Sequence, residues 1–376
     1  MKLSLVSQAL GAATLVAGLP SLVEKAPANI DLEDKAVLNQ SAPLLQIEGM
    51  AESLVTFRDA LKQFATAPKA KSNPATYNDT MSVPAKNFAT ASTAAAGSCT
   101  NPSIRYEWDN YPTADRQALM TAFKCLMTKA PSGKFPAAKS RWEDFVSLHQ
   151  MYTPNVHNNQ KFLPWHRYLI YTFEQALRNE CSFTGPMFWF DETKHSGSFQ
   201  NSDLFTSQYL GSLRNNANYC VNDGQFAGLT INVGPGNQNT PHCLSRNGDI
   251  ADTLQCNTIY VNMCMANSRY KDFERCFEYG PHGYGHNGVG GVMADVYASP
   301  AEPFFWFHHG FVDRAWRIWE LADPTNRYAY IDGTDINGNP ISLDTVIAMA
   351  GVQPDVTIRQ VINTQSGDPL CYRYNY

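Results

Sequence analysis

Two adjacent histidines, His308 and His309, lie inside the aromatic stretch PFFWFHHGFVDRAWRIW, Pro303 to Trp319. The apolar residues around them predict a buried helix. Burying an imidazole without a polar partner costs roughly a few kcal/mol. Both rings therefore need partners in the folded protein, and this requirement constrains the fold more than any other feature of the sequence.

A first group of three histidines lies upstream of this stretch, on two predicted helices and in the loop that follows the first of them. His149 shares a predicted helical stripe with Trp142 and Phe145, and His157 lies in the polar loop that follows. His166 lies on a second predicted helix, which carries a strong apolar pattern. One such histidine alone is more often a hydrogen-bonded core residue than a metal ligand.

A second group begins with His282 and His286 in GPHGYGHNG, where a spacing of four would place both rings on one helical face. Gly283 within this stretch weakens the prediction of a helix. Together with the His308-His309 pair, the stretch supplies a second set of three ligands. Two three-histidine sites facing each other predict a binuclear metal centre.

The ligand type narrows the choice of metal. Imidazole-only ligation suits copper, zinc, iron or nickel, and copper has the highest affinity among the divalent ions. The histidines lack the Glu-x-x-His carboxylates of di-iron bundles and the oxygen ligands that magnesium and calcium require. Copper is therefore favoured, with the other three metals left open.

Composition excludes several classes of partner. The chain has 376 residues, of which 44% are hydrophobic and 17% charged, so it can form a large core. Its net charge of −5 and its lack of a polybasic run provide no surface for nucleic acid or a membrane. No segment after the N-terminus has the about 18 unbroken apolar residues of a membrane span. We expect neither nucleic acid nor membrane as a partner.

The first 98 residues differ from the rest in character. Residues 1–19 begin with Met1-Lys2 and continue with apolar and small residues, which predicts a secretory signal peptide and a secreted protein. Residues 20–98 predict an N-terminal extension that ends in a linker rich in Ala, Ser, Thr, Pro and Asn. This segment could be a propeptide or a plain extension. Residues 99–376 are expected to form one catalytic domain.

The cysteines agree with export. All nine lie in the body of the chain, and an oxidising compartment would allow most of them to form disulfides. Because the number is odd, at least one stays outside an intramolecular disulfide, and the sequence leaves the pairing open. Glycosylation sequons at Asn39 and Asn78 fit the same compartment.

The segments FLPWHRYLIYTFEQALR and PFFWFHHGFVDRAW together resemble the two signature segments of type 3 copper proteins, which comprise tyrosinases, catechol oxidases and haemocyanins. The resemblance spans roughly Ile104 to Tyr374. It is strongest to the short secreted fungal catechol oxidases and tyrosinases. It implies a mainly α fold in which a central four-helix bundle holds a binuclear copper site. Long disulfide-linked loops are expected over Asn201 to Cys276.

The resemblance also implies a ligand set and an activity. Of the histidine pair, the family uses the second member as ligand, which leaves His308 beside the site. The implied reaction is copper-dependent oxidation of small o-diphenols (catechols) to o-quinones with O2. The six implied ligands of the two copper ions are His149, His157 and His166 for the first, and His282, His286 and His309 for the second.

Three further residues bear on specificity. Glu278 occupies the position where relatives place a carboxylate that holds a water near the coppers, and Gly283 replaces an Asn that shares this water in many tyrosinases with good monophenol activity. We therefore expect catechol oxidation to exceed monophenol hydroxylation. Val296 occupies the position of a large gate residue, and a small side chain would leave the entrance wide. Gly283 could instead allow close backbone approach, and Val296 could be ordinary core.

The resemblance also gives expectations for three features outside the ligand set. The motif Tyr372-Arg373-Tyr374 is expected to pack against Arg105. Asp313 is expected to orient a ligand histidine or to pair with Arg314. The family's PYWDW-like segment is replaced by PMFWFDE, Pro186 to Glu192, so packing beside the site is expected to differ.

Three alternative functions stay open. The first is a tyrosinase with full monophenolase activity, and the second is a haemocyanin-like O2-binding protein. The third is a zinc hydrolase or zinc-stabilised binding protein in which Glu278 serves as base. The small Val296 argues against an oxygen carrier, and the aromatic segment around His308 and His309 argues against zinc.

No cysteine lies between the first and third ligands, so the histidine thioether of many fungal tyrosinases is not expected. His195 and His242 lie in polar loops and are expected to have structural or surface roles.

Overall fold

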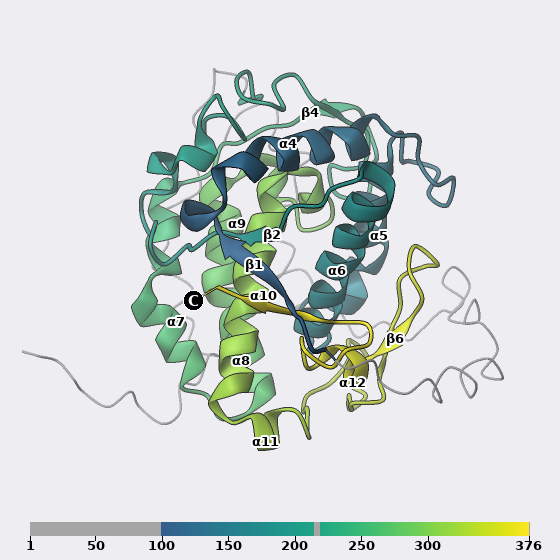
Figure 1. Ribbon diagram of the computed structural model, residues 1–376, viewed down its shortest axis with the longest axis vertical. Helices are drawn as coiled ribbons and strands as arrows, with labels where there is room; N and C mark the ends of the chain where they lie inside the picture. Colours follow the sequence, from purple (N-terminus) through teal and green to yellow (C-terminus); the bar gives the residue numbers. More distant parts are fainter. Residues whose placement is uncertain (1–98, 214–218, 376) are drawn as a thin grey trace, which may run out of the picture. The chain divides into compact units, whose positions relative to one another are not determined.

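A computed structural model describes residues 99–213 and 219–375 (Figure 1). The predicted signal peptide (1–19) and N-terminal extension (20–98) lie outside the described residues, so both stay predictions, as does the start of the catalytic domain at residue 99. Among the described residues, no helix is long and apolar enough to span a membrane.

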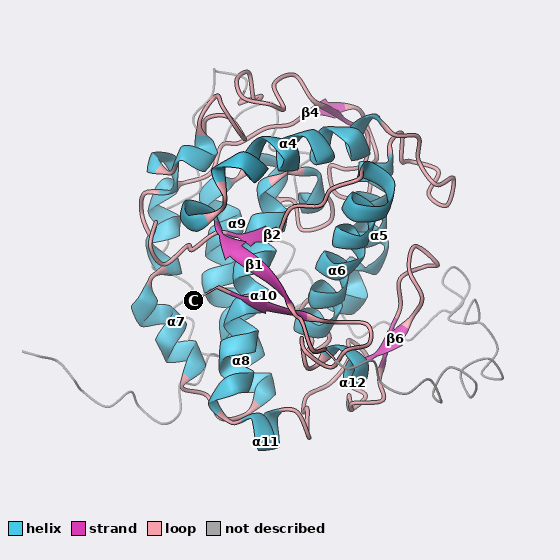
Figure 2. Ribbon diagram, viewed as in Figure 1, coloured by secondary structure: helices cyan, strands magenta, loops and turns pink. Residues whose placement is uncertain are grey.

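Helices make up most of the regular structure in the described residues, as predicted (Figure 2). The α-helices are α4 (Thr113–Thr128), α5 (Arg141–Val156), α6 (Phe162–Cys181), α7 (Thr258–Met265), α8 (Tyr270–Phe277), α9 (Gly283–Val289), α10 (Phe304–Ala322), α11 (Pro324–Arg327) and α12 (Ile358–Val361). The strands are β1 (Ser103–Glu107), β2 (Met187–Trp189), β3 (Thr230–Ile231), β4 (His242–Cys243), β5 (Val346–Ile347), β6 (Val356–Thr357) and β7 (Tyr372–Tyr374).

The histidine-bearing helices begin and end at residues that explain their bounds. The hydroxyl of Ser140 accepts a hydrogen bond from the backbone N–H of Glu143 and so caps the start of α5. Pro164 lies in the first turn of α6, where the missing N–H has no helical acceptor to lose. The helix ends at Cys181, and Ser182, which follows it, adopts a left-handed conformation (φ 55°).

A kink separates α8 from α9 and directs two histidines inward. Between the helices, Glu278–His282 forms a π-helical turn in which Gly280 leaves helical geometry (φ −92°, ψ −114°) and Pro281 follows. A Cβ on Gly280 would lie 2.8 Å from the Tyr260 ring, so any other residue here would require that ring to move. The turn places His282 at the start of α9.

The predicted helical centre is confirmed: α5, α6, α9 and α10 carry the six histidines or end directly beside them, and α6 packs against α10 and α5 (Figure 1). Aromatic rings fill the space between these helices. Phe173 of α6 stacks on Trp306 of α10 with centroids 3.6 Å apart, and Phe188 meets Phe307 at 4.1 Å. This packing fixes α10, and with it the His308-His309 pair, relative to α6.

A small parallel sheet joins the two ends of the described chain. Its strand order is β2-β1-β7, and the disulfide Cys99–Cys371 lies at its edge. Arg105 of β1 lies 3.5 Å from the centroid of the Tyr372 ring and donates to the hydroxyl of Tyr374 at 3.2 Å. The predicted contact between Arg105 and the tyrosine motif is confirmed.

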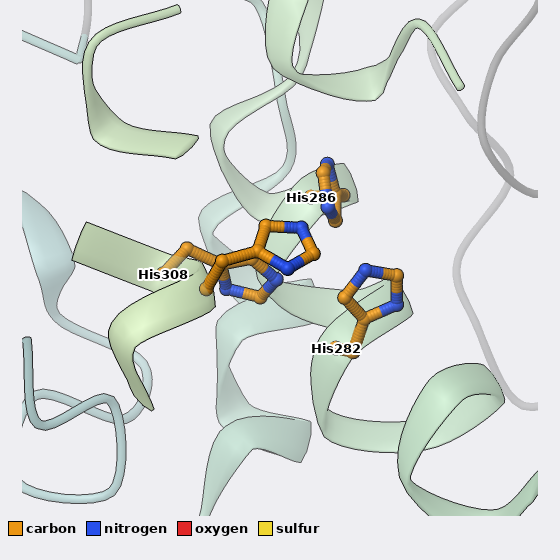
Figure 3. Close-up of side chains that lie close together, drawn as sticks. His282, His286 and His308 are labelled. Atoms are coloured by element: carbon orange, nitrogen blue, oxygen red, sulfur yellow. The ribbon is translucent and has the colours of Figure 1, made fainter. Parts of the chain in front are cut away.

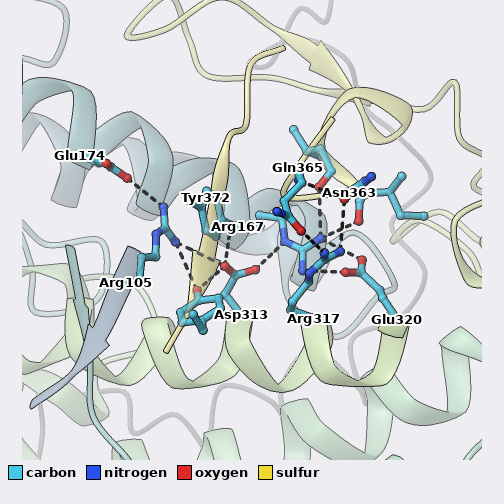
Figure 4. A network of polar contacts seen from close by, with 12 residues as sticks. Arg105, Arg167, Glu174, Asp313, Arg317, Glu320, Asn363, Gln365 and Tyr372 are labelled. Atoms are coloured by element: carbon cyan, nitrogen blue, oxygen red, sulfur yellow. Dashed lines mark hydrogen bonds and ion pairs between the residues drawn. The ribbon is translucent and has the colours of Figure 1, made fainter. Parts of the chain in front are cut away.

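Asp313 has different partners from those predicted (Figure 4). It forms ion pairs with Arg105 and Arg167 and accepts hydrogen bonds from the hydroxyls of Tyr372 and Tyr374. It therefore lies in a buried structural network, and among the described residues it forms no hydrogen bond or ion pair with a histidine. The expectation that Asp313 orients a ligand or pairs with Arg314 was wrong.

Disulfides and one free thiol account for the nine cysteines, as the odd number predicted. Cys256 is the free one, and it is buried. The expectation of long loops over residues 201–276 was only partly correct, because α7 and α8 lie within this region. The four disulfides are Cys99–Cys371, Cys125–Cys181, Cys220–Cys243 and Cys264–Cys276, the last of which joins α7 to α8.

Candidate metal centre

The first histidine group brings together three rings from neighbouring segments. His149 comes from α5, His157 from the residue after α5, and His166 from α6, and each is at most 2% exposed. Nε2 of His149 lies 3.2 Å from Nε2 of His157 and 3.3 Å from Nε2 of His166. Nitrogens bound tetrahedrally at about 2.0–2.1 Å from one ion would be about 3.3 Å apart. The spacing therefore fits a shared metal ion.

Hydrogen bonds at the opposite ring nitrogen fix the tautomer of all three. Nδ1 of His149 donates to the carbonyl of Tyr297 at 2.9 Å, and Nδ1 of His166 donates to the carbonyl of Phe162 at 2.8 Å. Nδ1 of His157 donates to a carboxylate oxygen of Glu278 at 3.0 Å. Because carbonyl and carboxylate oxygens accept hydrogen bonds, each Nδ1 carries the hydrogen and each Nε2 presents its lone pair to the centre.

The second group is assembled from α9 and α10. The ligand atoms of His282, His286, His308 and His309 all lie within 4.8 Å of one another, and the three labelled rings gather around one point in Figure 3. Nδ1 of His282 donates to the carbonyl of Glu278 at 2.9 Å, and Nδ1 of His286 donates to the carbonyl of Met293 at 2.6 Å. The predicted helical face for His282 and His286 is therefore present.

The two members of the adjacent pair differ in their surroundings. His309 stacks on His166 of the first group, with centroids 4.5 Å apart and planes 13° apart, and lies 4.1 Å from Phe305. Neither ring nitrogen of His309 has a hydrogen-bond partner among the described residues. His308 instead donates from Nδ1 to Glu192. The structure thus brings all six predicted ligands together and adds His308 to the second group.

Burial keeps the imidazoles uncharged. It lowers the pKa of His149 to about 4, and it holds the pKa of His157, His166, His282 and His286 well below the usual value. His309 is affected in the same way. Neutral imidazole is the form that binds metal, so the site needs no deprotonation at neutral pH.

Two phenylalanines line the space around both groups. The ring of Phe162 lies 4.6 Å from those of His166 and His282, and the ring of Phe305 makes an edge contact with His149 at 5.6 Å. Both side chains are fully buried. They limit water near the histidines and lower the local dielectric.

Glu278 is placed against the first group rather than toward open space. Besides His157, it accepts hydrogen bonds from the backbone N–H of Asn158 at 2.9 and 3.2 Å. Burial raises the pKa of Glu278 to about 8, and burial together with the neighbouring Glu278 holds the pKa of Glu274 well above its usual range. Glu274 was not identified from the sequence. It lies on α8, four residues before Glu278, and this spacing was the available signal.

The two remaining predicted site residues are both interior. Gly283 is the first residue of α9, directly after His282, and is buried. Val296 is fully buried, and its carbonyl lies 3.5 Å from the hydroxyl of Thr153. The next carbonyl along the chain, that of Tyr297, is the acceptor for His149. Val296 therefore lies beside the first group, and its gate role stays a prediction.

The other two histidines contact groups outside the centre. His195 stacks on Phe190 at 4.7 Å and pairs with Asp109, which also binds Lys194. Glu107 lies near Asp109 and His195, but the ion pair with Lys194 already compensates the charge of Asp109. Nδ1 of His242 donates to the carbonyl of Thr240 at 2.7 Å.

Comparison with known proteins agrees with this geometry. Residues 139–322 match the family described as the common central domain of tyrosinase. The chain is 30% identical over 336 residues to Tyrosinase P of Aspergillus terreus, covering 73% of this chain and 93% of that protein. It is 29% identical over 339 residues to N-acetyl-6-hydroxytryptophan oxidase ivoB of Emericella nidulans, covering 73% and 92%.

Two solved structures are also similar to this chain. A mutant of polyphenol oxidase from Thermothelomyces thermophila superposes with a TM-score of 0.67 at 27% identity, covering 78% of this chain and 93% of that one. A functional unit of octopus haemocyanin shares the fold, with a TM-score of 0.52 at 19% identity, covering 73% and 68%.

The chain belongs to the tyrosinase family of type 3 copper proteins. Its two histidine groups form the binuclear copper centre of that family, and the protein is a tyrosinase-type polyphenol oxidase that oxidises phenols.

Proposed function

We propose that this enzyme oxidises o-diphenols to o-quinones in preference to hydroxylating monophenols, and that it does so as a secreted protein. The first copper would be held by His149, His157 and His166. The second would be held by His282, His286 and His309. The convergence of Nε2 atoms in the first group and the neutral state of all six rings support this assignment.

The bound copper pair supplies two-electron redox chemistry with O2. Each o-diphenol loses two electrons and two protons as it becomes a quinone, so two diphenols reduce one O2 to two waters. The chain's contribution is to hold five of the six imidazoles by hydrogen bonds at Nδ1, and the sixth, His309, by stacking on His166. Phe162 packs against His166 and Phe305 against His309, so apolar side chains surround the histidines.

The proposed preference for diphenols rests on the hydrogen bonding of Glu278. Hydroxylating a monophenol requires the phenol to lose its proton as it binds, which needs a nearby base. The carboxylate of Glu278 already accepts from Nδ1 of His157 and from the N–H of Asn158. Gly283 has no side chain with which to hold a water. Oxidising an o-diphenol adds no oxygen to the ring and depends less on such a base.

The test compares initial rates with catechol and with tyrosine on copper-loaded enzyme. The wild type is expected to favour catechol strongly, and Gly283→Asn is expected to raise the ratio of monophenol to diphenol rates. Gly283→Ala is the matched control, because it adds a Cβ without an amide. An unchanged ratio in Gly283→Asn, or an equal rise in Gly283→Ala, would contradict the proposal. Two coppers per chain with no copper EPR signal at rest would support the coupled pair.

Secretion has a separate test. Four disulfides in the described residues are compatible with an oxidising compartment. Protein recovered from the medium of the producing cells is expected to begin after residue 19 when its N-terminus is sequenced. Recovery only from cell extracts, with residues 1–19 retained, would contradict secretion.

A further inference from the structure

The ends of two parallel strands bring three metal-binding side chains together outside the copper centre. β1 ends at Glu107, which pairs in register with Trp189 at the end of β2. Asp109 follows β1 in the 3-10 helix Trp108–Asn110, and His195 lies in the turns that follow β2. One ligand atom from each of Glu107, Asp109 and His195 lies within 4.8 Å of the other two.

His195 and Asp109 already have the spacing of two ligands on one ion. Nε2 of His195 lies 3.1 Å from Oδ2 of Asp109. Ligands bound tetrahedrally at about 2.0–2.1 Å from one ion would be about 3.3 Å apart. The ring of His195 is also held in place, because it stacks on Phe190 with planes 16° apart. A ligand whose orientation is fixed in advance loses little freedom on binding.

Glu107 supplies a buried oxygen that lacks a partner. Its side chain is 4% exposed, and Oε2 accepts a hydrogen bond from Asn110 at 2.9 Å, whereas Oε1 has no hydrogen-bond partner among the described residues. Burial, together with the nearby negative charges of Asp109 and Asp191, raises the pKa of Glu107. A buried acceptor without a partner costs free energy. A cation beside Glu107 would satisfy this oxygen and offset the negative charge.

Lys194 compensates only part of the charge at this place. Its ammonium pairs with Asp109, but its side chain is 50% exposed. An exposed ion pair contributes little to stability, so Lys194 can turn into solvent and leave Oδ2 of Asp109 to a metal ion. One ammonium also leaves the carboxylates of Glu107 and Asp191 without a matching positive charge.

We propose that Glu107, Asp109 and His195 bind a zinc ion, with water completing its coordination. One imidazole nitrogen and two carboxylate oxygens form a donor set that suits zinc. The imidazole argues against calcium and magnesium, which take oxygen ligands. The ion joins the segment after β1 to the segment after β2 and stabilises the fold there. This site is separate from the histidine centre, so the proposal does not depend on which phenols the enzyme oxidises.

The experiment titrates Zn(II) into full-length protein that already carries two coppers per chain. Calorimetric titration gives the dissociation constant, and metal analysis after gel filtration gives zinc and copper per chain. The wild type is expected to bind one zinc with no loss of copper. Its midpoint temperature of unfolding is expected to rise with zinc concentration, because an ion that binds only the native state stabilises it. No bound zinc, or zinc gained only as copper is lost, would overturn the proposal without any variant.

Two variants locate the ion. Glu107→Gln keeps an oxygen to accept from Asn110 but removes the charge, and His195→Gln removes the ring nitrogen. Each is expected to weaken zinc binding at least about tenfold, since loss of a residue that merely supports a metal ligand already costs about 10–100-fold. The matched control is His242→Gln, which changes a histidine outside the group and is expected to bind zinc as the wild type does. Wild-type affinity in both Glu107→Gln and His195→Gln, or an equal loss in His242→Gln, would overturn the proposal.

Lys194→Met distinguishes a metal site from a plain ion pair. Methionine keeps an apolar side chain of similar length but removes the ammonium that competes for Asp109. Zinc binding is therefore expected to tighten several-fold. Unchanged or weaker binding in this variant would show that Lys194 and the ion do not share Asp109, which contradicts the proposed site.

Discussion

The carboxylate of Glu278 accepts a hydrogen bond from Nδ1 of His157 at 3.0 Å. The backbone carbonyl of the same residue accepts from Nδ1 of His282 at 2.9 Å, so Glu278 contacts a histidine of each group. His157 follows the end of α5, and Asn158 after it has a positive φ of 57°. By binding both the ring of His157 and the N–H of Asn158, Glu278 fixes the one predicted ligand that no helix holds.

Replacing Glu278 is therefore expected to release the first copper before the second. Glu278→Ala leaves Nδ1 of His157 without its acceptor, and loss of such a partner weakens metal binding about 10–100-fold. Glu278→Gln is expected to weaken copper binding less than Glu278→Ala does, because its amide oxygen still accepts a hydrogen bond from His157. Copper per chain after dialysis against a chelator measures the effect.

A control for these variants is Glu180→Gln on α6, which changes a partly exposed partner of Arg141 far along the helix from His166. It is expected to keep both coppers. Two coppers retained as tightly in Glu278→Ala as in the wild type would show that Glu278 does not position His157.

Asp313 is expected to contribute strongly to stability. It is 3% exposed and lies between two guanidinium groups, those of Arg105 and Arg167. Asp313→Asn leaves two buried cations without their shared partner, and breaking a buried pair typically costs about 3–5 kcal/mol of unfolding free energy. Denaturant unfolding at pH 7 measures this. The control Asp344→Asn changes the exposed pair with Arg359, with side chains 74% and 57% exposed, and is expected to cost less than about 1 kcal/mol.

The carboxylate of Asp313 also predicts how the stability of the protein changes at acid pH. Burial alone would raise the pKa of Asp313, but the charges of Arg167 and Arg105 outweigh it, so the pKa lies below the usual value of 3.8. A lowered pKa contributes stability that is present above about pH 4 and is lost as the pH falls further. The wild type should lose this contribution below pH 4, and Asp313→Asn should lack that part of the loss. Identical acid slopes in the two proteins would contradict the assignment.

Cys256 gives a prediction about thiol chemistry. It is the free cysteine, it is fully buried, and burial raises the pKa of its thiol well above the usual range. The native protein is expected to release no colour with a thiol-specific disulfide reagent, and the denatured, unreduced protein should show one thiol per chain. More than one thiol after denaturation would show that one of the four disulfides is not formed.

Features carried by local sequence were predictable. The apolar spacing around His149 and His166 gave two of the central helices, and the interval of four gave the shared face of His282 and His286. The contact of Arg105 with the tyrosine motif followed from the family resemblance. The helix α8 was missed although Tyr270, Phe273 and Phe277 repeat at helical spacing, because the Asn, Gly and Cys content of the whole region suggested loops.

Features that depend on long-range pairing were not predictable. Asp313 meets Arg167, 146 residues away, only because α6 packs on α10. Glu192 follows β2 and reaches His308, 116 residues further along the chain, because β2 contacts α10. Spacing along one helix gives the neighbours at three and four residues, and it does not identify a partner on another element.

Val296 provides the test of substrate access. It lies beside the carbonyl that holds His149, and its side chain is fully buried. Val296→Phe adds volume in a packed place and is expected to cost about 1–3 kcal/mol of stability. If this position also borders the path of the substrate, kcat/KM for a bulky diphenol such as 4-tert-butylcatechol should fall several-fold more than for catechol. Val296→Leu is the control of intermediate size and is expected to give a smaller difference. An equal fall for both substrates would mean that Val296 is ordinary core, because strain in the core would affect every substrate alike.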